Sequence, residues 1–287
     1  MPASPSSSAQ AARQRLAAQL REMRRAAGIT GVQFAREAGW ADSSLASAIE
    51  LGKRTITVEH VRLWCRICGA SGGLTTDLLA EQAQVAGMWV TYQQLNRGGL
   101  KGAQKSIRQV YEELTLARSY QPKVFSGMVQ TEDYTRAAMA GVVIEQGVDV
   151  ENPAEDLAAA VAERMDRQTM LNRTDAKWLF LMEEWVLWVR PYPPQVHREQ
   201  LRHLLEVMRR PNVVVGIIPM NTFRRGIHPE EAFDITDSHM ATVELASGYL
   251  SVTRPDEVRM YTELWDRLWS LATFKNAAAL IERAMDR

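Results

Sequence analysis

The chain has 287 residues, of which 46% are hydrophobic and 24% charged, and its 34 basic and 34 acidic side chains balance. This length exceeds that of one minimal domain and favours one small and one large domain, each with its own core. The neutral total gives the whole chain no electrostatic preference for nucleic acid, and the longest apolar runs are far too short to span a membrane. Because the first ten residues contain neither a basic nor an apolar segment, we expect a disordered tail over residues 1–11 rather than a secretory signal.

The charge is unevenly distributed along the chain. Residues 10–70 contain ten basic and five acidic side chains, which leaves a balance of +5 there and makes the remainder slightly acidic. A basic head on a neutral or acidic body is typical of a protein that contacts DNA through one domain. The two cysteines, Cys65 and Cys68, are too few for a disulfide framework and fit the reducing cytoplasm. We therefore expect a cytoplasmic protein with a DNA-facing head.

The head is predicted to be all α-helical. Leu16, Leu20 and Met23 recur at helical spacing, and Gly28 supplies a stop signal after them. The predicted helices of the head cover residues 12–27, 31–38, 42–51 and 58–70. Short helices with a glycine-containing turn between the second and the third are typical of a helix-turn-helix, so we assign residues 12–72 to such a domain.

The remaining chain is predicted to form a helical linker over residues 73–103 and a larger mixed domain over residues 104–287. Short β-rich runs bounded by turn residues indicate strands, and longer periodic segments indicate helices. The predicted strands cover residues 178–182, 213–219, 233–236, 240–245 and 249–252. The predicted helices cover residues 103–119, 154–171, 195–209, 255–272 and 275–286, and another begins after Thr131. The fold class is therefore α+β, with an N-terminal all-α helix-turn-helix domain and a larger C-terminal mixed α/β domain.

Several segments of the chain follow the pattern of one known family. In the head they are LREMRRAAGIT, EAGW, IELGKRT and VRLWCRICGA, and in the body they include YEELTLARSYQPKVFSGMVQTEDYTRAAM, AERMDRQTML, EEWVL, VVVGIIP and LIERAM. With these segments the chain resembles actinobacterial regulators of the WhiJ type. In these regulators a Cro/CI-like helix-turn-helix of the xenobiotic-response-element (XRE) family precedes an associated domain of unknown function. The resemblance implies transcription regulation without catalytic activity, and it can include a small partner protein encoded next to the regulator.

The segment 39–54, GWADSSLASAIELGKR, lies where this family has the helix that enters the major groove of DNA. It is one residue longer than the family pattern, and the turn residue Ala41 accommodates the extra residue with the least disturbance. Asp42 is then expected to cap the helix by accepting hydrogen bonds from free backbone N–H groups. The side chains predicted to face the bases are those of Ser43, Ser44, Leu45 and Ser47.

This predicted base-facing surface has no long polar side chain. A bidentate contact between such a side chain and a base contributes roughly 1–3 kcal/mol of discrimination, which this helix lacks. Phosphate contacts, which position a protein without specifying sequence, are predicted for Lys53, Arg54 and Arg36. Gly31 replaces a phosphate-positioning glutamine of the family. The favoured hypothesis is a DNA-binding transcriptional regulator that forms a homodimer. The alternative is a helix-turn-helix-derived module that binds proteins and has no sequence-specific DNA binding.

No catalytic, metal or cofactor site is predicted. Cys65 and Cys68 have the CxxC spacing of zinc sites, but zinc needs about four ligands and no second pair is near, so we assign them a structural role. The five histidines and the serines show no metalloprotease, nucleophile-elbow or phosphate-loop pattern. An enzyme that uses the body within a biosynthetic cluster is therefore the least favoured hypothesis.

The body is expected to sense a ligand or to dock the small partner protein. Glu184 and Glu244 stand at the polar edges of two predicted strands and could converge on a cationic ligand, with Trp185 as part of an aromatic pocket. The favoured interpretation, however, is that these glutamates form ion pairs with Arg164 or Arg167 and that the tryptophans pack in the core.

Overall fold

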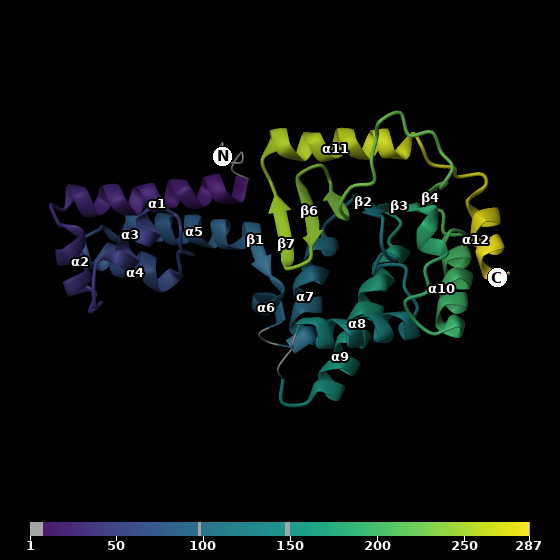
Figure 1. The fold of residues 1–287 in the computed structure, drawn as a ribbon, viewed down its shortest axis with the longest axis horizontal. Helices are drawn as coiled ribbons and strands as arrows, with labels where there is room; N and C mark the ends of the chain where they lie inside the picture. Colours follow the sequence, from purple (N-terminus) through teal and green to yellow (C-terminus); the bar gives the residue numbers. More distant parts are fainter. Residues whose placement is uncertain (1–7, 97–98, 147–149, 287) are drawn as a thin grey trace. The chain divides into compact units, whose positions relative to one another are not determined.

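A computed structural model describes residues 8–96, 99–146 and 150–286. The chain divides into two compact units, Met1–Val90 and Thr91–Arg287 (Figure 1). The first is built from helices and the second combines helices with a mixed sheet, which confirms the predicted fold class. Over the described ranges, no helix combines the length and the apolar character that a membrane crossing requires.

The first unit is a helical bundle around an aromatic core. Its helices are α1 (Ser8–Ala26), α2 (Gly31–Glu37), α3 (Ser44–Glu50), α4 (Val58–Ile67) and α5 (Gly72–Met88). Phe34 on α2 and Trp64 on α4 are fully buried, with ring centroids 4.1 Å apart. Helices α2 and α4 each begin with a capping box, in which the hydroxyl of Thr30 or Thr57 accepts a hydrogen bond from the backbone three residues later. These local signals fix where the two helices start.

Two predicted boundaries of the head differ from the structure. Residues 8–11, assigned to a disordered tail, belong to α1, which begins at Ser8. The expectation for residues 1–7 lies outside the described residues. Helix α5 begins the predicted linker, yet it packs on α1 and α4. Its Leu78 is buried in the core, and Gln82 donates a hydrogen bond to the carbonyl of Ile56. This part of the linker is therefore integral to the first unit.

A seven-stranded mixed sheet organises the second unit, with strand order β1-β7-β6-β5-β2-β3-β4. The strands are β1 (Trp89–Thr91), β2 (Leu116–Gln121), β3 (Lys177–Glu183), β4 (Val213–Ile218), β5 (Phe233–Thr236), β6 (Met240–Leu245) and β7 (Gly248–Val252). Strands β2, β3 and β4 pair in parallel, whereas β5 pairs antiparallel with both β2 and β6, and β6 antiparallel with β7. Parallel neighbours need crossover connections, and helices occupy both crossovers.

The helices of the second unit cover both faces of this sheet. They are α6 (Tyr92–Leu95), α7 (Gly99–Glu112), α8 (Glu132–Gln146), α9 (Pro153–Gln168), α10 (Pro194–Val207), α11 (Pro255–Trp269) and α12 (Ala277–Met285), with the short 3-10 helices η2 (Thr169–Asn172) and η3 (Glu184–Leu187). Helices α8 and α9 connect β2 to β3, and α10 connects β3 to β4 (Figure 1). Helix α11 covers the opposite face, where it packs with Tyr120, Leu181 and Phe233.

Strand β2 corrects one prediction. Residues 103–119 are predicted as one helix, whereas α7 ends at Glu112 and β2 begins at Leu116. The prediction is wrong because one face of β2 carries the polar side chains Ser119 and Gln121, so the strand has no clear apolar alternation. The five predicted strands coincide with β3 to β7 within a residue at each end.

Candidate nucleic-acid interface

Helix α3 occupies the position expected of the base-contacting helix. It begins at Ser44, with Ser43 at the N-cap position, and Ser43 makes no side-chain capping bond. The capping bond comes instead from Asp42, whose Oδ1 accepts the backbone N–H of Ser44 at 2.7 Å. This hydrogen bonding from Ser44 lowers the pKa of Asp42 below its usual range. Asp42 therefore caps the helix through its carboxylate as expected, but it lies one residue before the N-cap position, which Ser43 occupies.

The four side chains predicted to face bases are not equally accessible. Ser44 and Ser47 are exposed on one side of α3, and Ser43 is half-buried. Leu45 packs against the core of the first unit, so only part of its surface can contact thymine methyl groups. The outward surface of α3 thus consists mainly of two serine hydroxyls.

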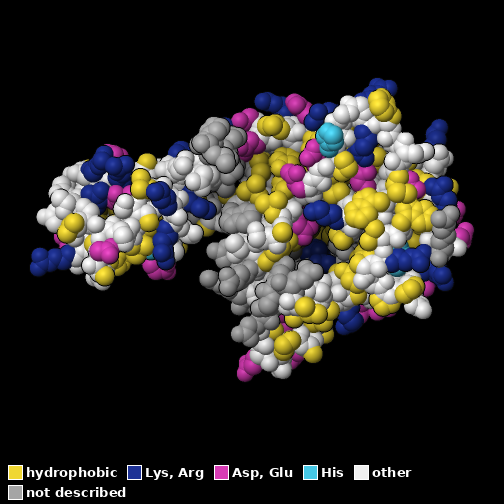
Figure 2. Space-filling model, viewed as in Figure 1, with side chains coloured by type: hydrophobic (Ala, Val, Ile, Leu, Met, Phe, Trp, Pro, Cys, Tyr) yellow, Lys and Arg dark blue, Asp and Glu magenta, His cyan; other side chains and the backbone are white. Residues whose placement is uncertain are grey.

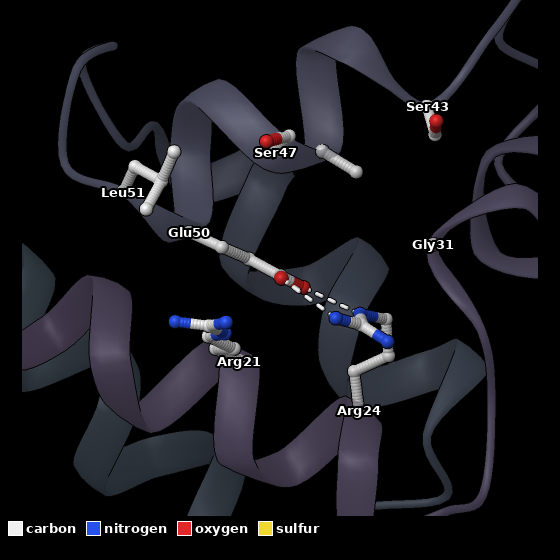
Figure 3. A pocket seen from close by; sticks show the side chains of 8 residues that line it. Arg21, Arg24, Gly31, Ser43, Ser47, Glu50 and Leu51 are labelled. Carbon is white, nitrogen blue, oxygen red and sulfur yellow. Dashed lines mark hydrogen bonds and ion pairs between the residues drawn. The ribbon is translucent and has the colours of Figure 1, made fainter.

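A shallow pocket lies beside α3, lined by residues from α1, α2 and α3 (Figure 3). Within it, Arg24 of α1 forms a bidentate ion pair with Glu50 of α3, with Nε to Oε1 at 2.6 Å and Nη2 to Oε2 at 2.8 Å. Nη1 of Arg24 also donates to the carbonyl of Ile29 at 2.6 Å. The hydrogen bond to Glu50 raises the pKa of Arg24. One guanidinium therefore ties α1 and the turn before α2 to the end of α3.

Arg21 is a basic residue of this pocket that the sequence analysis missed. It lies one turn before Arg24 on α1 and lines the pocket together with Ser47 and Leu51 of the α3 segment (Figure 3). Among the described residues it has no ion-pair partner, and it is half-buried. A guanidinium next to the exposed edge of α3 is well placed for a DNA phosphate. The spacing of three residues from Arg24 is the signal that could have identified it.

The predicted phosphate-contacting residues lie at the ends of α2 and α3. Lys53 and Arg54 are exposed and follow Gly52, whose φ of +65° ends α3. The backbone N–H groups of both residues bond to the carbonyl of Ala48, at 2.9 and 3.2 Å, which fixes this turn. Arg36 is exposed in the last turn of α2. Basic side chains are spread over the visible face of the first unit (Figure 2).

The ligand candidates of the body do not converge. Glu184 on η3 accepts hydrogen bonds from Arg283 Nη2 at 3.0 Å and from the backbone N–H of Met220 at 2.9 Å. Glu244 on β6 accepts from the hydroxyl of Tyr92 at 2.9 Å. The expected meeting of the two glutamates is wrong, because strands β2 and β5 lie between β3 and β6 in the sheet.

The other predictions for these side chains have different outcomes. In the part of the chain that the structure describes, neither glutamate forms an ion pair with Arg164 or Arg167. Trp185 is 39% exposed, so its ring lies at the surface. Its role in ligand binding stays a prediction.

The two cysteines lie in the helical bundle. Cys65 is buried in the core of the first unit, and Cys68 is half-buried at the end of α4. Burial raises the pKa of the Cys68 thiol to about 11, so this thiol stays protonated at neutral pH. Among the described residues, no cluster of three or more His, Cys, Asp or Glu side chains could hold a metal ion.

Comparison with protein families divides the chain in the same way. Residues 15–79 match a family described as a helix-turn-helix domain. Residues 105–283, more than half of the chain, match a family described as a domain of unknown function (DUF5753). Searches of curated proteins and of solved structures found no significant match.

Proposed function

Because the chain belongs to the DUF5753 family and carries a helix-turn-helix domain in front of that domain, we propose that it is a DNA-binding transcriptional regulator. The order of the two matched domains supports the predicted architecture of an XRE-type helix-turn-helix followed by an associated domain. As finer parts of the proposal, the protein is a cytoplasmic, actinobacterial regulator of the WhiJ type that binds DNA as a homodimer. Its body senses a ligand or docks a small partner protein, and we assign it no catalytic role.

The observation that carries the DNA-binding proposal is the basic surface around α3. Arg21, Arg36, Lys53 and Arg54 come from three neighbouring segments of the head, and all keep solvent access. Helix α3 itself is held in place through the ion pair between Arg24 and Glu50. With two serines as its main outward side chains, α3 can contribute little base discrimination. We therefore infer that phosphate contacts supply most of the affinity.

A gel shift with the region upstream of the protein's own gene tests this proposal. The double variant Lys53→Ala/Arg54→Ala is expected to bind at least about tenfold more weakly than the wild type, because two phosphate contacts are removed. The matched control is Arg259→Ala, an exposed arginine of α11 whose side chain is 68% exposed. Equal DNA affinity of the double variant and the control would refute the phosphate contacts assigned to Lys53 and Arg54.

A second function, a protein-interaction module without sequence-specific DNA binding, is favoured by one observation. The outward side chains of α3 include no residue that forms bidentate contacts with bases. Selection from a random DNA library distinguishes the two functions: an enriched motif supports the regulator. No enriched motif, together with a stable complex with a small co-encoded protein, supports the interaction module.

A further inference from the structure

The sheet of the second unit has a polar face that DNA binding does not use. Side chains in register across four strands, Ser119, Asp234, Thr242 and Ser251, share this face. On β3 the same row continues with Phe180, which is buried in the apolar core. Polar groups that face the inside of a domain are costly unless they meet water, one another or a ligand. Figure 2 shows the second unit hollowed in this region, with basic side chains deep in the hollow.

Two arginines of α9 supply positive charge within electrostatic range of this face. Arg164 donates from Nε to Gln104 Oε1 at 3.1 Å and from Nη1 to Gln130 Oε1 at 2.9 Å. Arg167 donates from Nη1 to the same oxygen of Gln104 at 3.1 Å. Only 3% of Arg167 is exposed, and its Nε has no hydrogen-bond partner among the described residues. The partners of both guanidiniums are thus neutral amides.

Buried arginines are ordinarily paired with carboxylates, because an uncompensated buried charge is costly. Here two like charges lie one helical turn apart, and burial together with the neighbouring Arg167 lowers the pKa of Arg164 to about 10. The backbone at Gly127 packs closely against both side chains, since an added Cβ would lie 3.3 Å from Arg167 Nη2 and 3.5 Å from Arg164 Cζ. Two oriented guanidiniums without a carboxylate partner match the geometry of a bound anion.

Carboxylates stand on the sheet side of the same cleft. Asp234 on β5 and Glu244 on β6 both keep partial solvent access. Burial raises the pKa of Asp234 to about 6, with a further increase from the nearby Glu244. Glu244 also lies in register with Tyr249 and accepts the hydroxyl of Tyr92. The arginines and carboxylates influence one another electrostatically, yet no ion pair joins them within the described ranges. The cleft therefore has a positive and a negative side.

We propose that this cleft binds a small zwitterionic molecule, whose carboxylate is held by Arg164 and Arg167 and whose ammonium group is held by Asp234 and Glu244. Small-molecule sites are concave and fix their ligands through a few convergent polar or charged groups, and groups with shifted pKa values are frequent in them. The site names the class of ligand that the body would sense. This sensing role rests on the proposed function as a transcriptional regulator. The body acts as a sensor through this site if binding of the zwitterion changes the affinity of the protein for DNA.

Thermal-shift and calorimetric titrations of the full chain with the standard α-amino acids, each chiral one in its L form, test the site. Comparison probes are propionate, which lacks the ammonium group, and ethylamine, which lacks the carboxylate. At least one amino acid is expected to raise the Tm of the wild type saturably, whereas neither comparison probe reproduces this effect. If no amino acid raises the Tm, or if propionate binds as tightly as the best amino acid, the zwitterion site is refuted.

Variants on each side of the cleft locate the binding. Arg167→Gln is expected to lower the affinity for the best-binding amino acid at least about thirtyfold, since the ligand carboxylate loses its buried partner. Asp234→Asn is expected to lower the affinity for the amino acid without creating any binding of propionate. Arg259→Gln, a matched loss of charge on the exposed face of α11, should bind like the wild type. Wild-type affinity in Arg167→Gln would overturn the assignment.

The stability of the variants separates a ligand site from a structural role. Without probe, Arg167→Gln is expected to melt at or above the Tm of the wild type, because a costly buried charge is removed. Arg167→Lys keeps the charge without the bidentate geometry and should bind with intermediate affinity. A strongly lowered Tm in Arg167→Gln combined with wild-type affinity in Arg167→Lys would make the arginine structural and overturn the proposal.

A gel shift with and without the best amino acid separates failure of the site from failure of the proposed function. Amino acid binding that leaves DNA affinity unchanged retains the site and refutes the sensing role. DNA binding without any amino acid binding retains the regulator and refutes the site.

Discussion

The ion pair between Arg24 and Glu50 is expected to hold α3 in the position proposed to contact DNA. The two side chains keep only 12% and 6% of their surface exposed and share two hydrogen bonds, at 2.6 and 2.8 Å. In Glu50→Gln, Arg24 loses its carboxylate and stays largely buried. Removal of one partner from a fully buried pair costs about 3–5 kcal/mol. Since Arg24 retains some exposure and its bond to Ile29, we expect the free energy of unfolding of the first unit to fall by about 2–3 kcal/mol.

Hydrogen exchange measured by mass spectrometry on the full chain reports this loss locally. Peptides from α1 and α3 are expected to exchange about 30- to 150-fold faster in Glu50→Gln, whereas peptides from the sheet of the second unit stay unchanged. The double variant Arg24→Met/Glu50→Leu is expected to recover part of the loss, because an apolar pair of similar size needs no compensating charge. The matched control is Glu22→Gln. Glu22 pairs with Arg25 at the surface, where its side chain is 70% exposed.

The result that would refute this reasoning is a change of less than about 0.5 kcal/mol in Glu50→Gln, the value typical of a surface ion pair. Such a result would mean that apolar packing alone positions α3. Loss of protection in both units would also contradict the local role assigned to this pair.

Three further predictions concern separate sites. Gly31→Gln is expected to strengthen DNA binding severalfold in a gel shift, because a Cβ at this position lies 3.7 Å from the Cβ of Ser43 and the added amide can reach a phosphate; unchanged or weaker binding would contradict this. The pKa of Asp234 is raised to about 6, against about 3.9 in an unfolded chain, so the folded protein binds this proton more tightly than the unfolded one. The free energy of unfolding should therefore fall by about 2 kcal/mol as pH rises from about 4 to 6. Urea titrations of Asp234→Asn should lack this fall, and an identical pH dependence would refute it. Because its pKa is about 11, Cys68 should react with iodoacetamide at pH 8 roughly a hundredfold more slowly than an ordinary thiol, as measured by mass spectrometry, and a rate equal to that of free cysteine would exclude this protonated state.

The sequence was sufficient for elements with local signals. The capping threonines Thr30 and Thr57 and the glycine stop at Gly28 mark helix ends within a few residues, and five strands follow from their apolar runs. Strand β2 is not predicted from the sequence, because its face with Ser119 is polar. The alternation of apolar and polar residues that identifies a strand is therefore missing. This polar face therefore hides the alternation from which a strand is predicted.

The candidate sites show the same limit. The exposed positions of Lys53 and Arg54 directly after α3 are predictable, because nearby residues define the end of this helix, whereas their contacts with DNA stay a prediction. The partner of Glu50 was not, since Arg24 precedes it by 26 residues and comes from another helix. For Arg164 the sequence predicts only an ion pair with the glutamates of the body, because sequence spacing cannot show that its neighbours in the fold are neutral glutamines.

The salt dependence of DNA binding tests most directly whether phosphate contacts dominate the affinity. With Arg21, Arg36, Lys53 and Arg54 each neutralising one phosphate, the plot of log affinity against log salt should have a slope of about −3.6 per bound head, or about −7 for two heads. Lys53→Ala/Arg54→Ala should reduce the steepness by about 1.8 per head, and a scrambled duplex of equal length should bind within about tenfold of the upstream region. A slope shallower than about −2 that the double variant leaves unchanged would contradict phosphate-driven binding.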